Sequence, residues 1–306
     1  MRRNNITRLA LILLIAVSAG CAVCGEAASS TILPITKSIA KDPYVGAIVV
    51  DAESGLVLFD DNSSADIYPA STVKLMDLLL ILEKVQRGEL QLSDTVTVGA
   101  EAAGMGGSQV YLGQGERFTV DDLLYALMVE SANDAAVALA IHTAGSEEAF
   151  VRQMNERAAE IGMKSTQFAS SHGLPPGKGE LPDVSTPHDL SLLARELLDH
   201  PEALRYTGCR EKVFRAGERP LLMRNHNHLL GVVDGCDGLK TGYFGAAGFS
   251  IVATARLNDR HLVAVVAGCR DPKTRDRTAR RLLTELATPM KGRRDQADQA
   301  IPRIGG

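Results

Sequence analysis

The sequence predicts an α+β fold of three layers, α/β/α, in which helices flank an antiparallel sheet and an all-helical lobe is inserted. β-prone runs occur near both ends of the chain, at 45–51, 56–59, 245–256 and 261–268. The region between them, from about 119 to 200, has apolar residues at helical spacing. Strands from the two ends can bury their apolar faces by joining, which favours one sheet beside a helical lobe.

The first part of the chain is expected to form a hairpin followed by a long helix. The segment 53–55 (Glu-Ser-Gly) separates the first two β-prone runs and is typical of a hairpin turn. Pro69 fits the first turn of a helix, where a missing N–H costs nothing. A helix is therefore expected from Ala70 to Arg87, ending before a glycine.

Capping residues and periodicity predict the later elements. Thr119 begins a capped helix, and Thr186 followed by Pro187 begins another. The remaining expected elements are a strand at 95–98, helices at 135–142, 147–161 and 186–198, a turn at 258–259 between the C-terminal strands, and a helix at 276–286.

The composition supports a large folded unit and argues against several partner classes. With 306 residues, of which 45% are hydrophobic, the chain can bury a sizeable core as one domain or two lobes. The net charge is −4 without a long basic run, and tryptophan is absent, so nucleic acid is not an expected partner. The glycine cluster at 104–107 lacks the lysine and the spacing of a phosphate loop. We expect no cofactor.

Residues 1–28 have the pattern of an export signal. Three arginines precede an apolar run at 9–19 that is too short to span a bilayer. The box at 18–21 (Ser-Ala-Gly-Cys) resembles a bacterial lipoprotein signal, in which Cys21 would carry lipid and tether the protein to a membrane. Cleavage after Ala27 is the alternative, and the sequence leaves both open. We expect an exported protein, in the periplasm or at the exterior of the cell envelope.

After the signal we expect a linker at 29–43, one folded domain at 44–290 and a polar, disordered tail at 291–306. Three cysteines, at 209, 236 and 269, fall in the folded domain, but their positions give no disulfide connectivity. No Cys-x-x-Cys pair lies outside the signal region, so a structural zinc site is not expected.

Ser71 and Lys74 are the first candidates for a chemical site. They lie three residues apart near the start of the expected helix and share one face of it. A serine near the positively polarised start of a helix, beside an amine, can be activated as a nucleophile. Chance yields this Ser-x-x-Lys spacing about once in a chain of this length. Ser38 begins a second copy, but no apolar helix follows it.

Two further motifs single out Ser71. Ser131-x-Asn133 lies at a junction between expected helices, and Lys240-Thr241-Gly242 lies just before the C-terminal strands. This order of motifs resembles penicillin-binding proteins and serine β-lactamases. Over about residues 44–288 the chain resembles the low-molecular-mass D-alanyl-D-alanine carboxypeptidases. The segments that carry this resemblance are 69–76, 113–116, 123–124, 131–136, 154–156, 162–163, 172–174, 225–227 and 238–242.

The resemblance implies a β-lactamase/DD-peptidase-like fold and a set of catalytic roles. Ser71 would be the nucleophile, with Lys74 as its base. That role needs a neutral amine, and burial and the nearby charge of Lys240 would both lower the lysine pKa. Ser131 would hydrogen-bond Lys74 and relay the proton to the leaving amine. Asn133 would offer its amide to the peptide bond of the substrate.

The same resemblance implies how a substrate that ends in a carboxylate would be held. Lys240 would supply positive charge and Thr241 a hydroxyl, with Gly242 next to them. The oxyanion hole would consist of the backbone N–H groups of Ser71 and Tyr243.

His226 marks a departure from the family pattern. Some relatives have an arginine here, between two asparagines, that helps to bind the terminal carboxylate. Either this position varies freely, or a protonated His226 adds to carboxylate binding and the affinity falls as the pH rises past its pKa. No carboxylate or third histidine lies at ligand spacing from His226 and His228, so no metal is expected.

The function implied is removal of the terminal D-alanine from peptidoglycan stem pentapeptides, with β-lactam antibiotics as covalent inhibitors at the same serine. A class A β-lactamase is the nearest rival, but no Glu-x-x-Leu-Asn segment lies between Asn133 and Lys240. The motifs are also compatible with a DD-endopeptidase and with a catalytically silent cell-wall binding module. Cross-link preference and oligomeric state cannot be derived from the sequence.

Overall fold

The computed structural model describes residues 38–215, 217 and 219–287. The chain divides into two units, Met1–Ile32 and Leu33–Gly306, and the description below concerns the second. The expected signal at 1–28, the first part of the linker at 29–43 and the tail at 291–306 lie outside the described residues, so these remain predictions.

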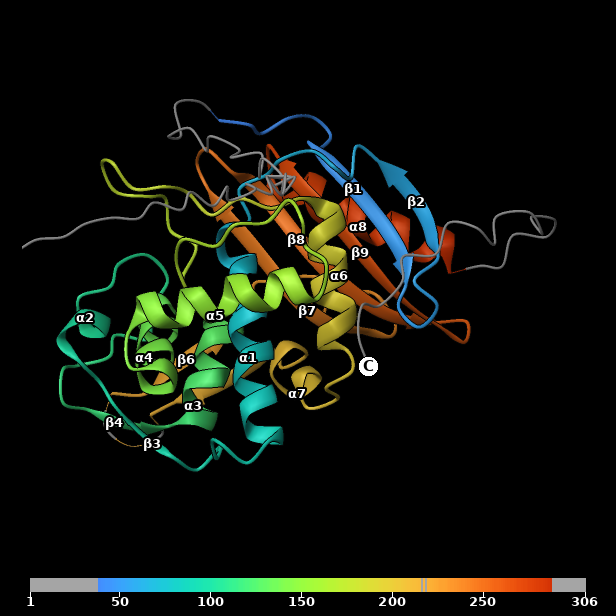
Figure 1. The fold of residues 1–306 in the computed structure, drawn as a ribbon. Coiled ribbons are helices and arrows are strands. Elements are labelled where there is room, and N and C mark those ends of the chain that lie inside the picture. Colours follow the sequence, from blue (N-terminus) through green and yellow to red (C-terminus); the bar gives the residue numbers. More distant parts are fainter. Residues whose placement is uncertain (1–37, 216, 218, 288–306) are drawn as a thin grey trace, which may run out of the picture. The chain divides into compact units, whose positions relative to one another are not determined.

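Both ends of the described chain build one antiparallel sheet (Figure 1). Its five strands stand in the order β2-β1-β9-β8-β7. The strands are β1 (Gly46–Asp51), β2 (Val57–Asp61), β7 (Cys236–Phe244), β8 (Gly248–Leu257) and β9 (Arg260–Cys269). Antiparallel pairing of β1 with β9 places Val49 opposite Ala264 and so joins the two ends. The predicted sheet is confirmed, but its edge strand β7 was not among the predicted strands, and the Lys240-Thr241-Gly242 motif lies within it rather than before the C-terminal strands.

Helices cover both faces of this sheet. Side chains alternate along β1, so that Ala47 belongs to one hydrophobic core and Ile48 to the other. Helix α8 (Pro272–Leu286) packs on β8 and β9, where it shares the core of Ala47. Helix α6 (Pro187–Leu197) packs on β1 and β9 and shares the core of Ile48 (Figure 1). This is the predicted three-layer arrangement.

The inserted lobe is helical, and local caps set the starts of its helices. Thr119 caps α3 (Val120–Tyr125) and Thr186 caps α6, each accepting a hydrogen bond from the backbone N–H three residues later, as predicted. The other helical elements are the 3-10 turn η1 (Ala70–Val73), α1 (Lys74–Gln86), α2 (Ala100–Ala103), the π turn η2 (Ala126–Glu130), α4 (Asn133–Ala144), α5 (Glu147–Glu160) and α7 (Ala203–Thr207).

Two short ribbons complete the described fold, and the sequence pattern did not predict them as pairs. They are β3 (Thr95–Thr97) with β4 (Arg117–Thr119), and β5 (Glu211–Phe214) with β6 (Leu221–Arg224). Strands this short contain too few alternations to give a recognisable period.

Two expected helices begin earlier than predicted, at Asn133 and at Pro272. Asp271 explains the second case, because its side chain accepts a hydrogen bond from the Thr274 N–H and caps the helix. No helix in the described part of the chain is long and apolar enough to cross a membrane. Cys209, Cys236 and Cys269 are free thiols.

Candidate active site

Ser71 and Lys74 lie where η1 passes into α1. Ser71 is in the 3-10 turn and half-buried, and Lys74 opens the α-helix and is fully buried. The Lys74 Nζ and Ser71 Oγ atoms are 3.2 Å apart. Ala70, immediately before the serine, has a φ of 48°, an uncommon conformation for a residue with a side chain. Such strain persists where the surrounding packing imposes it, which is common at functional sites.

Two further oxygens fix the Lys74 amine. Its Nζ donates to Asn133 Oδ1 at 2.8 Å and to the backbone carbonyl oxygen of His172 at 2.6 Å. Burial lowers the pKa of Lys74 to about 8, and the charge of Asp77 is the largest effect that opposes this. A substantial neutral fraction of the amine is therefore present in mildly alkaline solution.

Asn133 and Ser131 come from the predicted junction between helices, at the start of α4. The Asn133 Nδ2 donates to the carbonyl oxygen of Gly106 at 2.7 Å, so the amide oxygen is turned toward Lys74. Gly107 packs on this amide, because a Cβ there would stand 2.7 Å from Asn133 Nδ2.

Ser131 follows the π turn η2 with a left-handed φ of 62° and is almost fully buried. In the described part of the chain its hydroxyl makes no hydrogen bond, so the predicted contact with Lys74 is not formed. Hydrogen bonds at catalytic sites often tighten only when substrate binds.

Lys240, Thr241 and Gly242 lie on β7, at the edge of the sheet, where the strand passes η1. Lys240 is buried, and its Nζ donates to the carbonyl oxygen of Thr241 at 3.2 Å. Burial, followed by the charge of Lys74, lowers the pKa of Lys240 well below its usual value. The charge of Lys74 therefore acts on Lys240, whereas Lys240 is not among the charges that act on Lys74. The expected lowering of the Lys74 pKa by Lys240 stays a prediction.

Tyr243 is the next residue on β7. Its side chain is 55% exposed and stacks on Phe249 with ring centroids 4.0 Å apart. Its backbone N–H follows directly after Gly242, the residue of β7 that packs on η1.

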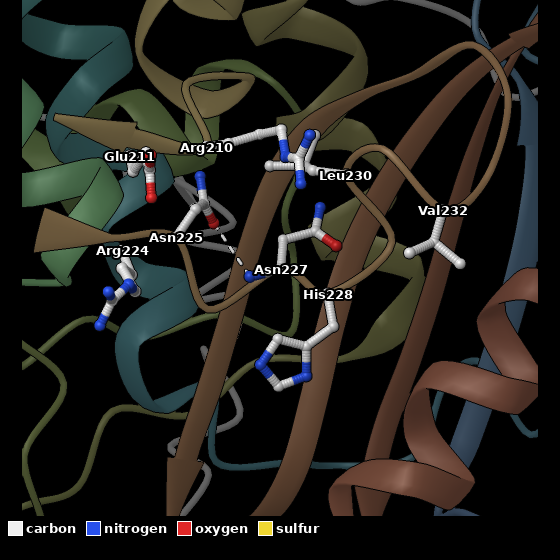
Figure 2. A pocket seen from close by; sticks show the side chains of 8 residues that line it. All are labelled: Arg210, Glu211, Arg224, Asn225, Asn227, His228, Leu230 and Val232. Atoms are coloured by element: carbon white, nitrogen blue, oxygen red, sulfur yellow. Dashed lines mark hydrogen bonds between the residues drawn. The ribbon is translucent and has the colours of Figure 1, made fainter.

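His226 lies in a loop that two asparagines hold. The Asn227 N–H donates to Asn225 Oδ1 at 2.9 Å (Figure 2), and Asn227 Nδ2 donates to the carbonyl oxygen of Gly238 on β7 at 2.9 Å. Burial, followed by the charge of Lys240, lowers the pKa of His226 to about 4. A pKa this low leaves the ring of the substrate-free protein neutral between pH 5.5 and 8. It argues against the predicted fall of substrate affinity through loss of the His226 charge in that range. A direct hydrogen-bonding role for His226 remains a prediction.

The same loop borders a surface hollow of about 680 Å³. Figure 2 shows its side chains, which are Arg210, Glu211, Arg224, Asn225, Asn227, His228, Leu230 and Val232. None of the predicted catalytic residues lines it.

The structure adds site groups that the sequence interpretation missed. The carbonyl oxygen of His172 contacts Lys74, and Gly173 packs so tightly on η1 that a Cβ would stand 2.2 Å from the Ala70 carbonyl oxygen. Asp77 is buried one turn after Lys74. His172 and Gly173 belong to a segment that carries the family resemblance, but a backbone carbonyl leaves no signature in the choice of side chain.

The comparisons with known proteins agree with this geometry. A family model for D-alanyl-D-alanine carboxypeptidase, peptidase family S11, matches residues 39–271, and the chain belongs to this family. The D-alanyl-D-alanine carboxypeptidase DacF of Bacillus subtilis is 37% identical over 238 residues, which cover 78% of this chain and 60% of DacF. DacC of Escherichia coli is 34% identical over 259 residues, covering 80% and 62%. The chain thus spans about three fifths of the length of these curated relatives.

Solved structures show the same fold. DacD from Francisella tularensis superposes with a TM-score of 0.75 at 27% identity, covering 87% of this chain and 75% of that one. Penicillin-binding protein D2 from Listeria monocytogenes, in its ampicillin-bound form, has a TM-score of 0.70 at 30% identity, covering 80% of this chain and 97% of that one.

Proposed function

We propose that the protein is a serine-type D-alanyl-D-alanine carboxypeptidase, which removes the terminal D-alanine from peptidoglycan stem pentapeptides through an acyl-enzyme on Ser71. Family membership supports the reaction class. The hydrogen bonding of Lys74 is the observation that carries the proposal for this chain.

A neutral lysine amine has two N–H donors and one lone pair. Two of the Lys74 contacts are with oxygens that can only accept, the Asn133 amide oxygen and the His172 carbonyl oxygen. In the neutral amine these contacts use both N–H groups, which leaves the lone pair for the hydroxyl of Ser71. In the ammonium form the third N–H instead donates to Ser71 Oγ, the contact at 3.2 Å. The arrangement of the neutral form is that of a base holding the proton of a nucleophile.

In the proposed acylation step, Ser71 Oγ attacks the carbonyl carbon between the two D-alanines while its proton passes to Lys74. The developing oxyanion accepts hydrogen bonds from the N–H groups of Ser71 and Tyr243. The C–N bond then breaks as Ser131 gives its hydroxyl proton to the leaving D-alanine amine. Ser131 takes up the proton held by Lys74 in exchange, which returns Lys74 to the neutral amine. Water later hydrolyses the ester, which releases the shortened peptide and restores Ser71.

The terminal carboxylate of the substrate is proposed to bind at β7. Thr241 offers a hydroxyl, and Lys240 becomes a stronger attraction when a bound carboxylate favours its charged form. Gly242 lets this strand approach η1, which brings the carboxylate site next to the serine. Asn133 and His226 are proposed to hydrogen-bond the substrate backbone and its terminus.

β-Lactams mimic the D-alanyl-D-alanine terminus and are proposed to acylate Ser71. The relative from Listeria binds ampicillin. Because no Glu-x-x-Leu-Asn segment lies between Asn133 and Lys240, we expect the β-lactam ester to persist rather than turn over.

Release of D-alanine from a synthetic pentapeptide, together with labelling by a fluorescent penicillin, tests the function. Ser71→Ala should abolish both. Labelling without D-alanine release would indicate a silent binding module. Rapid nitrocefin hydrolysis would indicate a β-lactamase, and cleavage of purified cross-linked dimers without carboxypeptidase activity would indicate an endopeptidase.

We infer a location in the cell envelope, because the family acts on peptidoglycan and residues 1–28 have a signal pattern. A lipid tether at Cys21 is part of this proposal. Incorporation of a labelled fatty acid into the wild type but not into Cys21→Ala would support the tether, and equal labelling of both would contradict it.

A further inference from the structure

Asp77 is a buried acid for which the proposed reaction has no use. It lies on α1 three residues after Lys74, on the same face of the helix, at about 4.5 Å along the axis. Its side chain is only 1% exposed. Neither carboxyl oxygen has a hydrogen-bond partner in the described part of the chain.

The acids that surround the pair are in a different situation. Asp183 accepts hydrogen bonds from two backbone N–H groups and the Ser170 hydroxyl. Asp134 accepts from the backbone N–H groups of Val110 and Leu112. Glu147, at the start of α5, accepts from the N–H and hydroxyl of Ser171. These three carboxylates fix nearby backbone by accepting hydrogen bonds, whereas Asp77 accepts no hydrogen bond from the described residues.

The charges that act on the pair come from α1 itself, from α4 and α5 and from the segment that carries Asp183, and none of them comes from α6 or α7, which also pack on α1. The charges of Lys74, Glu147 and Asp183 act on Asp77. The charges of Asp77, Asp183 and Asp134 act on Lys74. Lys240 on β7 is itself affected by the charge of Lys74. Of these, Asp77 exerts the largest charge effect on Lys74, and Lys74 the largest on Asp77.

A buried carboxylate without hydrogen bonds is stable only when it is protonated or faces a cation. Burial raises the pKa of Asp77 well above its usual value, and the ammonium of Lys74 is the largest effect that lowers it. Ionised Asp77 in turn favours the ammonium form of Lys74 over the neutral amine. The charge of each group therefore affects the pKa of the other.

We propose that Asp77 acts through Lys74 as a positioning residue, whose ionised carboxylate holds Lys74 as the ammonium and so sets how high the pH must rise before Lys74 can accept the proton of Ser71. This inference rests on the function proposed above. It assigns to Asp77 the control of the acid limb, the part of the pH profile in which acylation of Ser71 increases with pH.

The sign of the effect follows from the charge of Asp77. At low pH both groups are protonated and the amine cannot act as a base. Where Asp77 is ionised, its charge favours the ammonium, and Lys74 loses its proton at a higher pH than it would beside a neutral residue. Removal of the carboxylate should therefore let Lys74 become a base at lower pH.

The test is the second-order rate constant for acylation of Ser71 by a fluorescent penicillin, measured from pH 5 to 10. Asp77→Asn, which is nearly isosteric and neutral, should move the acid limb down by about one pH unit or more. Its plateau should fall by less than about tenfold, because a less basic amine accepts the proton less readily. Asp77→Leu is a second variant without the charge and should show the same shift.

Glu83→Gln is the matched control. It makes the same carboxylate-to-amide change on α1, nine residues after Lys74 and in contact with Arg157. Its acid limb should coincide with that of the wild type. A merely structural role of Asp77 would change the melting temperature and the plateau but would leave the limb in place.

Two results would overturn the inference: an unmoved limb in both Asp77 variants, or the absence of acylation at every pH in both although they fold. If the wild type is not labelled and does not release D-alanine at any pH, the proposed function is wrong, and the inference that rests on it is wrong as well. If the wild type is labelled but the acid limbs of both Asp77 variants coincide with its own, the inference about Asp77 is wrong and the proposed function stands.

Discussion

Gly242 on β7 lies so close to Pro69, just before the turn that carries Ser71, that an added Cβ would stand 2.5 Å from the Pro69 carbonyl oxygen. The nearest side chains are those of Ala70 and Thr72, at 3.3 and 3.2 Å from the same position. The absence of a side chain at 242 is therefore what lets the strand of the proposed carboxylate site lie directly against the turn that carries Ser71.

Gly242→Ala should impair acylation far more than it impairs folding. The strand must withdraw from η1 to make room for the methyl group, and a displacement of about 1 Å at a reacting centre costs roughly 100-fold in rate. Gly245→Ala is the control, since nothing lies within 4 Å of a Cβ at that position. The measurement is the rate of penicillin labelling of each variant, with the melting temperatures of both measured to show that they are folded. Equal labelling rates would contradict the close-packing argument.

Lys74→Arg should strongly slow acylation at every pH. Arginine keeps the positive charge but does not lose its proton in proteins, so it cannot take the proton of Ser71. Loss of a general base lowers a rate by about 10²- to 10⁴-fold. In the wild type, where burial lowers the Lys74 pKa to about 8, kcat/KM should increase with pH up to that region and then level off. A wild-type profile that is flat from pH 6 to 9 would show that neutral Lys74 is not the base.

Asn133→Asp should shift the acid limb to higher pH. The new carboxylate would replace an amide oxygen 2.8 Å from Lys74 Nζ, and a negative charge at that distance favours the ammonium form by about 1–3 pH units. The direction is opposite to that expected for Asp77→Asn. Asn258→Asp makes the same charge change at the exposed turn between β8 and β9 and should leave the profile unchanged.

His226→Ala should give a KM profile parallel to that of the wild type between pH 5.5 and 8. With its pKa lowered to about 4, the imidazole carries no charge to lose in this range. His226→Arg should lower KM for a pentapeptide across the range, because arginine restores a fixed cation next to the terminal carboxylate. A KM that increases with pH only in the wild type would instead show that bound substrate raises the histidine pKa into the range.

Several features of this protein follow from short stretches of sequence. Thr119 and Thr186 predict helix starts because a cap involves only neighbouring residues. Ser71 and Lys74 share a helix face because their spacing is three residues. The order of the three motifs sufficed to recognise the family, and the β-prone runs at both ends sufficed to predict the sheet except for its edge strand β7.

Only the tertiary structure decided how these stretches meet. The Lys74 amine is fixed by Asn133, 59 residues away, and by the carbonyl oxygen of His172, 98 residues away. A backbone carbonyl has no side-chain signature, so no sequence pattern could reveal that contact. The same holds for the low pKa of His226 and for the unpartnered state of Asp77, since both depend on burial by segments distant in the chain. The residue types of the site are local information, whereas their protonation states are set by the packing of the whole described domain.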